Sequence, residues 1–166
     1  MHGMYAANVA VGKCDLLFSI GTRFNDRITG RIHEFAPKAK IVHIDIDTAS
    51  ISRNIHVDVP IVADAKEAIE KMLAYVKESD TEQWLAKIEG WRAEHPLSAC
   101  DKPGLTPQKI LNAINQTFDK AIVVTDVGQH QMFTTQYLEL TPEKKLLTSG
   151  GLGTMGYGFP GAVGAK

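Results

Sequence analysis

Glycine is concentrated near the end of this sequence, in a stretch where the main chain itself could bind a ligand. Between Ser149 and Gly164 lie seven of the fourteen glycines, with Met155 as the one bulky unbranched apolar residue among them. Glycine is unfavourable in regular structure and is used where a backbone turns sharply or approaches a ligand closely. The stretch therefore predicts a loop that lies against a cofactor, with the Met155 side chain wedged beside it.

A second candidate site precedes this loop, after the predicted strand Ala121–Thr125. The strand leads through Gly128 into a predicted helix whose first residues are Gln129 and His130. Free N–H groups and the dipole at the start of a helix favour an anion, and both side chains can donate further hydrogen bonds. The segment is a candidate phosphate site; the alternative is that His130 is an ordinary residue of a helix N-terminus.

A third set of groups, in the first third of the chain, suits a nucleotide. One predicted strand ends at Gly21, and Asp45, near the end of the next, follows 24 residues later. Such a carboxylate can accept the ribose hydroxyls of a nucleotide, and Arg23 and Arg27 could bind a pyrophosphate or the edge of a flavin. The Gly-x-Gly-x-x-Gly fingerprint of NAD domains is absent, so the pattern gives an ordinary NAD domain little support.

The same residues also have a purely structural interpretation. Asp26 and Arg27 could form a surface ion pair, and Asp45 and Asp47 could simply end a strand. A metal site at His43 and Asp45 is disfavoured, because strand alternation explains their spacing and no third ligand is evident.

The elements that would position these groups alternate between strand and helix. Strands are predicted at Leu16–Gly21, Ile41–Asp47 and Val57–Ala63, followed by a helix that Asp64 caps. An apolar stripe on that helix predicts a buried face at Ile69, Met72, Leu73 and Val76. This rhythm is typical of an α/β fold, with parallel sheets flanked by helices.

The middle of the chain differs in pattern and suggests a boundary between two domains. Residues 81–105 contain a polar helix with Trp84 and Trp91 one heptad apart, which predicts two aromatic side chains packed on a neighbouring surface. A Pro- and Gly-containing segment follows, and we interpret 81–105 as a linker between domains at 1–80 and 106–166. The second domain restarts with a helix capped by Thr106, whose core face is predicted at Ile110, Leu111, Ile114 and Phe118, and a further strand is predicted at Leu146–Ser149.

Composition narrows the class of protein. The 166 residues are 44% hydrophobic and 22% charged, with a net charge of -1, which gives no electrostatic case for nucleic acid or an anionic membrane. No apolar run approaches the length of about 20 residues that crosses a bilayer. Cys14 and Cys100 match no metal spacing and are expected to be reduced thiols of a cytoplasmic protein.

Four segments together resemble the large catalytic subunits of acetolactate synthases, a family of thiamine diphosphate enzymes. The resemblance rests on Gly21-Thr-Arg-Phe-Asn-Asp-Arg27, Ile41-Val-His-Ile-Asp-Ile-Asp47, Gly128-Gln-His-Gln-Met132 and Ser149-Gly-Gly-Leu-Gly-Thr-Met-Gly156. It covers essentially the whole chain. Residues 1–80 are then similar to the later part of a Rossmann-like FAD-binding middle domain, and residues 106–166 to the start of the domain that binds the thiamine diphosphate.

The resemblance also implies roles for individual residues. FAD would contact His2, Gly21, Thr22, Arg23, Asp26, Arg27, Asp45, Ile46, Asp64 and Ala65, together with Gly150 and Gly151 from the second domain. Thiamine diphosphate would contact Gln129 and His130 through its phosphates and the carbonyl of Gly153 through its aminopyrimidine amine, while Met155 keeps its two rings bent. The family usually has Asp where this chain has Asn25, and often Trp in place of Phe133.

The implied activity belongs to branched-chain amino acid biosynthesis. In the family, pyruvate is decarboxylated and its two-carbon unit is condensed with a second 2-oxo acid, pyruvate or 2-oxobutanoate. The implied assembly is a homodimer or larger, with a possible small regulatory subunit. The catalytic Glu and the Mg2+ ligands of the family lie outside this chain, so no catalytic or metal residue is assigned here. We expect the chain to be an internal piece of a longer protein and to have no synthase activity by itself.

Two alternative functions stay open at this point. One is another thiamine diphosphate enzyme, such as a glyoxylate carboligase or a 2-oxo acid decarboxylase. The other is a non-catalytic module that binds FAD or NAD.

Overall fold

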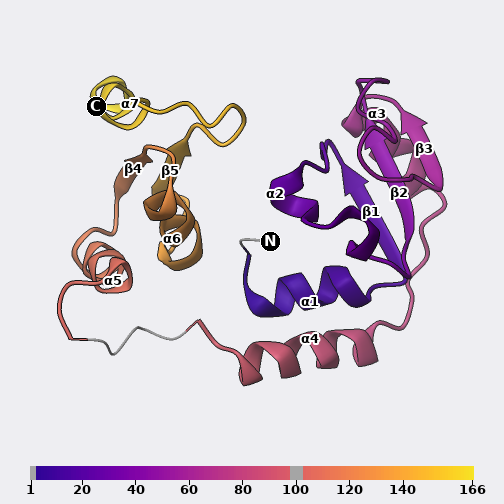
Figure 1. The fold of residues 1–166 in the computed structure, drawn as a ribbon, viewed down its shortest axis with the longest axis horizontal. Helices are drawn as coiled ribbons and strands as arrows, with labels where there is room; N and C mark the ends of the chain where they lie inside the picture. Colours follow the sequence, from indigo (N-terminus) through magenta and orange to yellow (C-terminus); the bar gives the residue numbers. More distant parts are fainter. Residues whose placement is uncertain (1–2, 98–102) are drawn as a thin grey trace. The chain divides into compact units, whose positions relative to one another are not determined.

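The computed structural model describes residues 3–97 and 103–166, which form two compact units divided between Pro96 and Leu97 (Figure 1). The division lies inside the segment 81–105 that the sequence predicts as a linker. The helix at the start of that segment belongs to the first unit. The domain boundaries proposed from the sequence stay predictions.

The first unit contains a sheet of three parallel strands in the order β1-β2-β3. The strands are β1 (Leu16–Ile20), β2 (Lys40–Asp45) and β3 (Val59–Val62), so all three predicted strands are present, each shorter than predicted. Ile20 lies opposite Ile44, which lies opposite Ile61. Because parallel strands end at the same edge of a sheet, the segments after β1 and β2 begin side by side.

Helices surround this sheet: α1 (Tyr5–Lys13), α2 (Asp26–Thr29), the 3-10 helix η1 (Ile32–Glu34), α3 (Ala65–Leu73) and α4 (Glu82–Glu94). Helices α1 and α4 lie side by side in Figure 1. The rings of Trp84 and Trp91 meet edge to face at 5.7 Å, and the Lys13 ammonium lies 5.1 Å from the Trp91 ring centre. The prediction that the two tryptophans pack on a neighbouring surface is confirmed, and that surface is α1.

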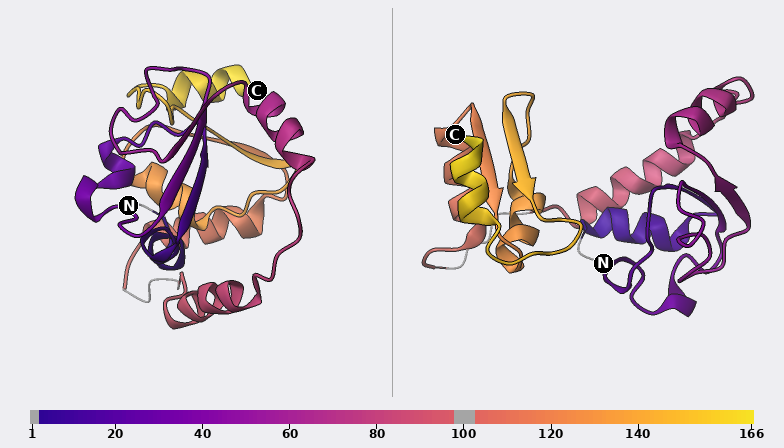
Figure 2. Two further views of the ribbon diagram at one scale, coloured as in Figure 1. Left: turned by 90° about the vertical axis from the view of Figure 1, so that its right-hand side faces the viewer. Right: turned by 90° about the horizontal axis from the view of Figure 1, so that it is seen from above.

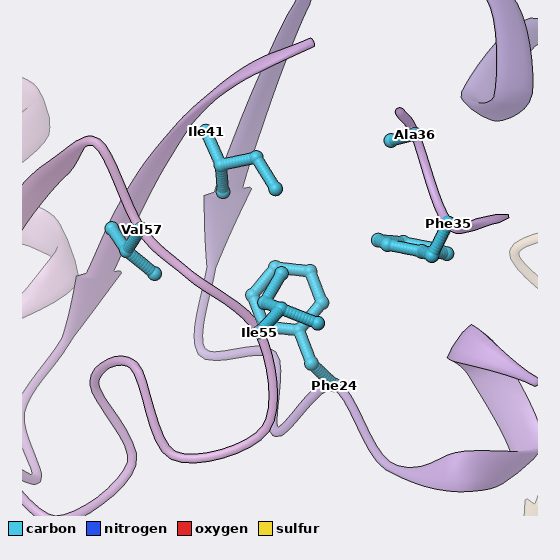
Figure 3. Close-up of a cluster of buried hydrophobic side chains, with 6 residues drawn as sticks. All are labelled: Phe24, Phe35, Ala36, Ile41, Ile55 and Val57. Atoms are coloured by element: carbon cyan, nitrogen blue, oxygen red, sulfur yellow. The ribbon is translucent and has the colours of Figure 1, made fainter. Parts of the chain in front are cut away.

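A compact group of buried side chains holds the loops of the first unit to one face of its sheet. It consists of Phe24, Phe35, Ala36, Ile41, Ile55 and Val57 (Figure 3). Phe24 comes from the turn after β1 and has a positive φ of 47°, a strained conformation for an aromatic residue. Burial of its ring offsets that strain and fixes the turn on which Arg23 and Asn25 lie.

The predicted buried stripe of α3 is wrong for the described structure. Ala68 is the one buried residue of α3, whereas Leu73 and Val76 are 65% and 66% exposed. The helix contacts β2, and its apolar side chains Ile69 and Leu73 are exposed. The capping prediction is confirmed, because Asp64 accepts hydrogen bonds from the Lys66 and Glu67 N–H groups.

The second unit repeats the α/β pattern on a smaller scale. Its elements are α5 (Pro107–Thr117), β4 (Ala121–Thr125), α6 (Gln129–Tyr137), β5 (Lys144–Thr148) and α7 (Gly158–Ala165). Strands β4 and β5 are parallel and pair Thr125 with Thr148, while α7 packs beside β4 (Figure 2). The predicted fold class, α/β with parallel sheets flanked by helices, is confirmed.

Polar side chains connect the helices of the second unit. Asn115 of α5 donates to the Tyr137 carbonyl and accepts from the Glu139 N–H, so it binds the end of α6. Lys144, 3% exposed, donates through Nζ to the Asn115 carbonyl near the end of α5. Thr106 caps α5 as predicted. The predicted core face of α5 is correct for Leu111, but Ile110 and Phe118 are exposed.

One of the two cysteines, Cys14, lies within the described residues. Cys14 is a free thiol that donates to the Val11 carbonyl, and burial raises its pKa. Cys100 lies outside the described residues.

Two glycines of the C-terminal cluster are explained by packing of α7 on β4. A Cβ atom at Gly158 would lie 2.8 Å from the Asp126 amide nitrogen, and one at Gly161 would lie 3.1 Å from a Val124 methyl group. The sequence interpretation placed the glycine-rich stretch against a ligand and its end, Phe159 to Ala165, in the first turns of a buried helix. At these two positions the close approach is instead between a helix and a strand.

Replacement of Gly158 tests this packing. Because the obstructing atoms at Gly158 are backbone and cannot move aside, Gly158→Ala is expected to lower the free energy of unfolding by about 1–3 kcal/mol. Gly164 is in the same helix and faces open space, so Gly164→Ala should be neutral or stabilising by up to about 1 kcal/mol. Urea unfolding of both variants measures the difference, and equal effects would show that α7 does not pack this way.

Candidate functional site

The first unit has a cavity of about 700 Å³ at the carboxyl ends of β1 and β2. Ligands of open parallel sheets bind at this edge. The cavity is lined by residues that follow these two strands: Gly21, Arg23, Asn25, Asp45, Ile46, Asp47, Ser50, Arg53 and Asn54.

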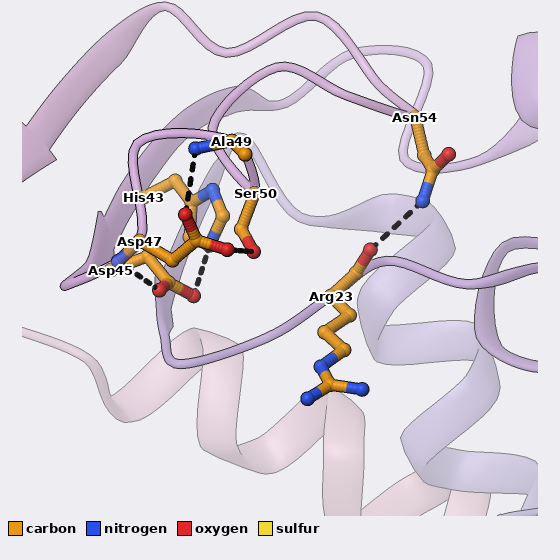
Figure 4. Close-up of polar contacts among 7 residues, drawn as sticks. All are labelled: Arg23, His43, Asp45, Asp47, Ala49, Ser50 and Asn54. Atoms are coloured by element: carbon orange, nitrogen blue, oxygen red, sulfur yellow. Dashed lines mark hydrogen bonds and ion pairs between the residues drawn. The ribbon is translucent and has the colours of Figure 1, made fainter. Parts of the chain in front are cut away.

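The turn after β1 places backbone and cationic groups at this cavity. Gly21 has a φ of 64° and donates its N–H to the Ile44 carbonyl, so the chain turns at the point where β1 ends. The Arg23 carbonyl accepts a hydrogen bond of 3.0 Å from the Asn54 side chain (Figure 4). This bond joins the turn after β1 to the loop after β2, so both sides of the cavity are held together.

Asp45 occupies the end of β2, where it is largely buried yet reaches the cavity. Its side chain is 11% exposed, and Oδ1 accepts the Asp47 N–H at 2.9 Å. Asp47 in turn accepts from the Ala49 N–H and the Ser50 hydroxyl. Two successive aspartates thus shape the start of the loop, which leaves Asp45 as a carboxylate fixed at the cavity wall.

The structure brings together part of the predicted FAD site. Gly21, Arg23, Asp45 and Ile46 line one cavity, and Thr22 is half-buried between the first two. The other predicted residues of this unit do not line it. Asp26 and Arg27 pair with each other at 2.9 Å on the exposed first turn of α2, as the structural alternative proposed, and Asp64 and Ala65 begin α3. His2 lies outside the described residues.

Five residues of the cavity were not among the predicted FAD contacts: Asn25, Asp47, Ser50, Arg53 and Asn54. The last three lie in the long loop between β2 and β3, where sequence spacing does not show which side chains face the cavity. One signal in the sequence could have found the loop residues. They belong to a polar segment that directly follows the strand ending near Asp45, which was already a candidate site.

The second unit brings its two strand ends into direct contact. The Thr125 hydroxyl lies 2.9 Å from the Thr148 hydroxyl, which also accepts from the Gln131 amide at 2.7 Å. Asp126 Oδ1 accepts the Tyr157 N–H at 3.0 Å, so the end of the glycine-rich loop is bound to the start of the β4–α6 turn. The carboxyl ends of β4 and β5 therefore lie together at one edge of the sheet.

Helix α6 begins at this edge of the sheet. Gly128 precedes it with a φ of 151°, and among the described residues no side chain caps its N-terminus. A Cβ atom at Gly128 would lie 3.2 Å from the His130 ring, so the glycine makes room for the imidazole. Gln129 and His130 are exposed at the first turn of the helix, where free N–H groups favour an anion.

The glycine-rich loop stays close to the β4–α6 turn. Gly153 has a φ of 67°, and a Cβ atom added there would lie 3.9 Å from the Val127 side chain. Ser149 organises the loop by accepting from the Gly153 N–H through its carbonyl and from the Thr154 N–H through its hydroxyl. Gly150 and Gly151 are exposed in this loop, and Met155 is 82% exposed. The predicted roles of these residues toward FAD and thiamine diphosphate stay predictions.

Residues 3–97 and 103–166 contain no cluster of three or more His, Cys, Asp or Glu side chains arranged to hold a metal ion. No helix in these same ranges combines the length and apolar character that a membrane crossing needs.

Comparisons with known proteins assign both units to one enzyme family. Residues 1–72 match the central domain of thiamine pyrophosphate enzymes, and residues 126–166 match their C-terminal TPP-binding domain. Over its whole length the chain is 45% identical to an acetolactate synthase large subunit of Cyanidium caldarium and 45% to a probable one of Methanocaldococcus jannaschii. It is 42% identical to that of Porphyra purpurea.

The chain spans about 30% of the length of these relatives. Its two matched regions follow each other in the order central domain, then TPP-binding domain. The chain therefore belongs to the thiamine pyrophosphate enzyme family and is similar, from its first residue to its last, to acetolactate synthase large subunits.

Proposed function

We propose that the protein to which this chain belongs is an acetolactate synthase, a thiamine diphosphate-dependent transferase. It decarboxylates pyruvate and condenses the two-carbon unit with a second pyruvate or with 2-oxobutanoate, in branched-chain amino acid biosynthesis. The observation that carries this proposal is the 45% identity to acetolactate synthase large subunits across both matched regions. We further propose a cytoplasmic location and a homodimer or larger assembly, with a possible regulatory subunit.

The second unit fits the diphosphate end of the coenzyme. The uncapped start of α6 offers backbone N–H donors, and Gln129 and His130 can add side-chain donors beside them. The glycine-rich loop leaves main-chain groups accessible, since a Cβ at Gly151 would meet open space. Met155 projects into solvent, where its side chain is available to pack against a bound ring.

Thiamine diphosphate, when bound, supplies the electron sink for the carbon that loses CO2. The residues of this chain bind and orient it: donors of α6 hold an anion, and the glycine-rich loop offers the Gly153 carbonyl as a hydrogen-bond acceptor. Mg2+ and the catalytic Glu are proposed to be held outside this chain.

The cavity of the first unit fits FAD. Its volume of about 700 Å³ is within the range of ligand sites, and Arg23 and Arg53 supply cationic groups for phosphates. Asp45 supplies a fixed acceptor for ribose hydroxyls. We propose FAD as a structural cofactor, which Gly150 and Gly151 would also contact.

Product analysis tests the activity. The full-length protein encoded by the gene, supplied with pyruvate, thiamine diphosphate, Mg2+ and FAD, is expected to form acetolactate, and acetohydroxybutyrate when 2-oxobutanoate is added. Release of acetaldehyde alone, or carboligation of glyoxylate in preference to pyruvate, would identify a different enzyme of the family. The 166-residue chain by itself should form no acetolactate.

Loss of the Asp45 charge tests the FAD site. Asp45→Asn in the full-length protein should raise the Kd for FAD by about 10–100-fold, because hydrogen bonds to a charged acceptor are lost. Flavin fluorescence titration measures the Kd. Glu70→Gln, at an exposed position of α3, is the control and should leave it unchanged. An unaltered Kd in Asp45→Asn would place FAD elsewhere.

The phosphate site of the second unit is tested through His130. His130→Ala should raise the Kd for thiamine diphosphate by roughly tenfold, since one donor to a charged phosphate is removed. Isothermal titration with Mg2+ present gives the Kd. Gln116→Ala, exposed on α5, is the matched control. If both variants bind like the parent protein, His130 is not a phosphate ligand.

A further inference from the structure

His43 is a polar residue whose side chain is fully buried. It lies in the middle of β2, its side chain is 0% exposed, and among the described residues neither Nδ1 nor Nε2 has a hydrogen-bond partner. Burial of polar atoms without partners is unfavourable, so an apolar residue of similar size would be the more stable choice at this position. The imidazole therefore calls for an explanation beyond packing.

The carboxylate of Asp45 lies close to the imidazole. His43 and Asp45 are two residues apart on one strand and share a face of the sheet. Nε2 of His43 lies 3.7 Å from Oδ2 of Asp45 (Figure 4). This distance exceeds that of an ordinary hydrogen bond by less than about 1 Å. The other oxygen, Oδ1, already accepts the Asp47 N–H at 2.9 Å. Oδ1 of Asp45 thus accepts a backbone N–H, while Oδ2 faces the imidazole.

The remaining surroundings hold the imidazole in place. The ring of Phe24 packs edge-on against it, with ring centres 5.0 Å apart and an angle of 81°. Ser19 of β1 and Pro60 of β3 are its neighbours in register. Phe24 also fixes the turn after β1 that carries Arg23. The contact between the Phe24 and His43 rings therefore connects β2 to the turn after β1, and residues of both line the cavity.

We propose that His43 is a positioning residue for Asp45. This inference rests on the proposed FAD site. Nε2 of the imidazole directs its N–H at Oδ2 from the buried side, while the Asp47 N–H holds Oδ1. The plane of the carboxylate is then fixed, and the lone pairs that remain face the cavity, where they accept the ribose hydroxyls of the nucleotide. A carboxylate fixed before binding loses less conformational freedom when the ligand arrives.

The test is a double-mutant cycle on FAD affinity in the full-length protein. His43→Leu should raise the Kd for FAD by roughly tenfold, because Asp45 loses one of its two fixed donors. In the Asp45→Asn background the same substitution should change the Kd by less than about twofold, since its target is already altered. Equal factors in both backgrounds would overturn the proposal and leave His43 a packing residue.

A pair of amide variants tests the position of the donor and does not depend on the leucine variant folding. The terminal amide of Gln reaches about as far as Nε2, whereas that of Asn reaches only about as far as Nδ1. His43→Gln should therefore keep the Kd within about threefold of the parent, and His43→Asn should resemble His43→Leu. The opposite order, or equal losses in both, contradicts a donor directed from Nε2.

Stability of the FAD-free protein provides a second readout. If His43 acts through Asp45, His43→Leu should be at least as resistant to urea as the parent while binding FAD more weakly. Loss of stability and of affinity together would instead indicate a structural role. If Asp45→Asn leaves the Kd for FAD unchanged, the proposed FAD site itself fails. That result is separate from a failure of the His43 cycle.

Discussion

Both candidate sites depend on one constraint: loops that follow neighbouring parallel strands are fixed by an aspartate that accepts a backbone N–H. Asp45 accepts from Asp47 at the end of β2, and Asp126 accepts from Tyr157 at the edge of β4 and β5. Parallel pairing brings the strand ends together, and these bonds give the following loops a defined shape. These two hydrogen bonds hold the loops in place, and the loops in turn position the groups at the cavity and at the N-terminus of α6.

Local rules were sufficient to predict the elements and their caps. Asp64 and Thr106 cap the helices expected of them, Gly128 begins α6, and β4 has the predicted bounds. These features depend on residues within a few positions of each other, so the sequence carries them directly. Asp45 was identified for the same reason, because alternation and the end of a strand place it at the edge of the sheet.

Features that depend on distant residues could not be predicted in this way. Arg53 and Asn54 reach the cavity through a long loop, and the Asn54 bond to Arg23 spans 31 positions. The apolar face of α3 was predicted to be buried, but Leu73 is exposed. Periodicity shows which face of a helix is apolar and does not show which element covers it. Gly158 was assigned to a ligand for a related reason, since glycine content does not tell a cofactor from a neighbouring strand.

The most direct test is a crystal structure of the full-length protein with FAD and thiamine diphosphate bound. We expect Asp45 to accept a ribose hydroxyl of FAD on the face turned away from His43, and a diphosphate to lie at the N-terminus of α6 beside His130. A structure in which the ribose of FAD has no contact with Asp45, or in which the diphosphate lies away from the β4–β5 edge, would contradict this account.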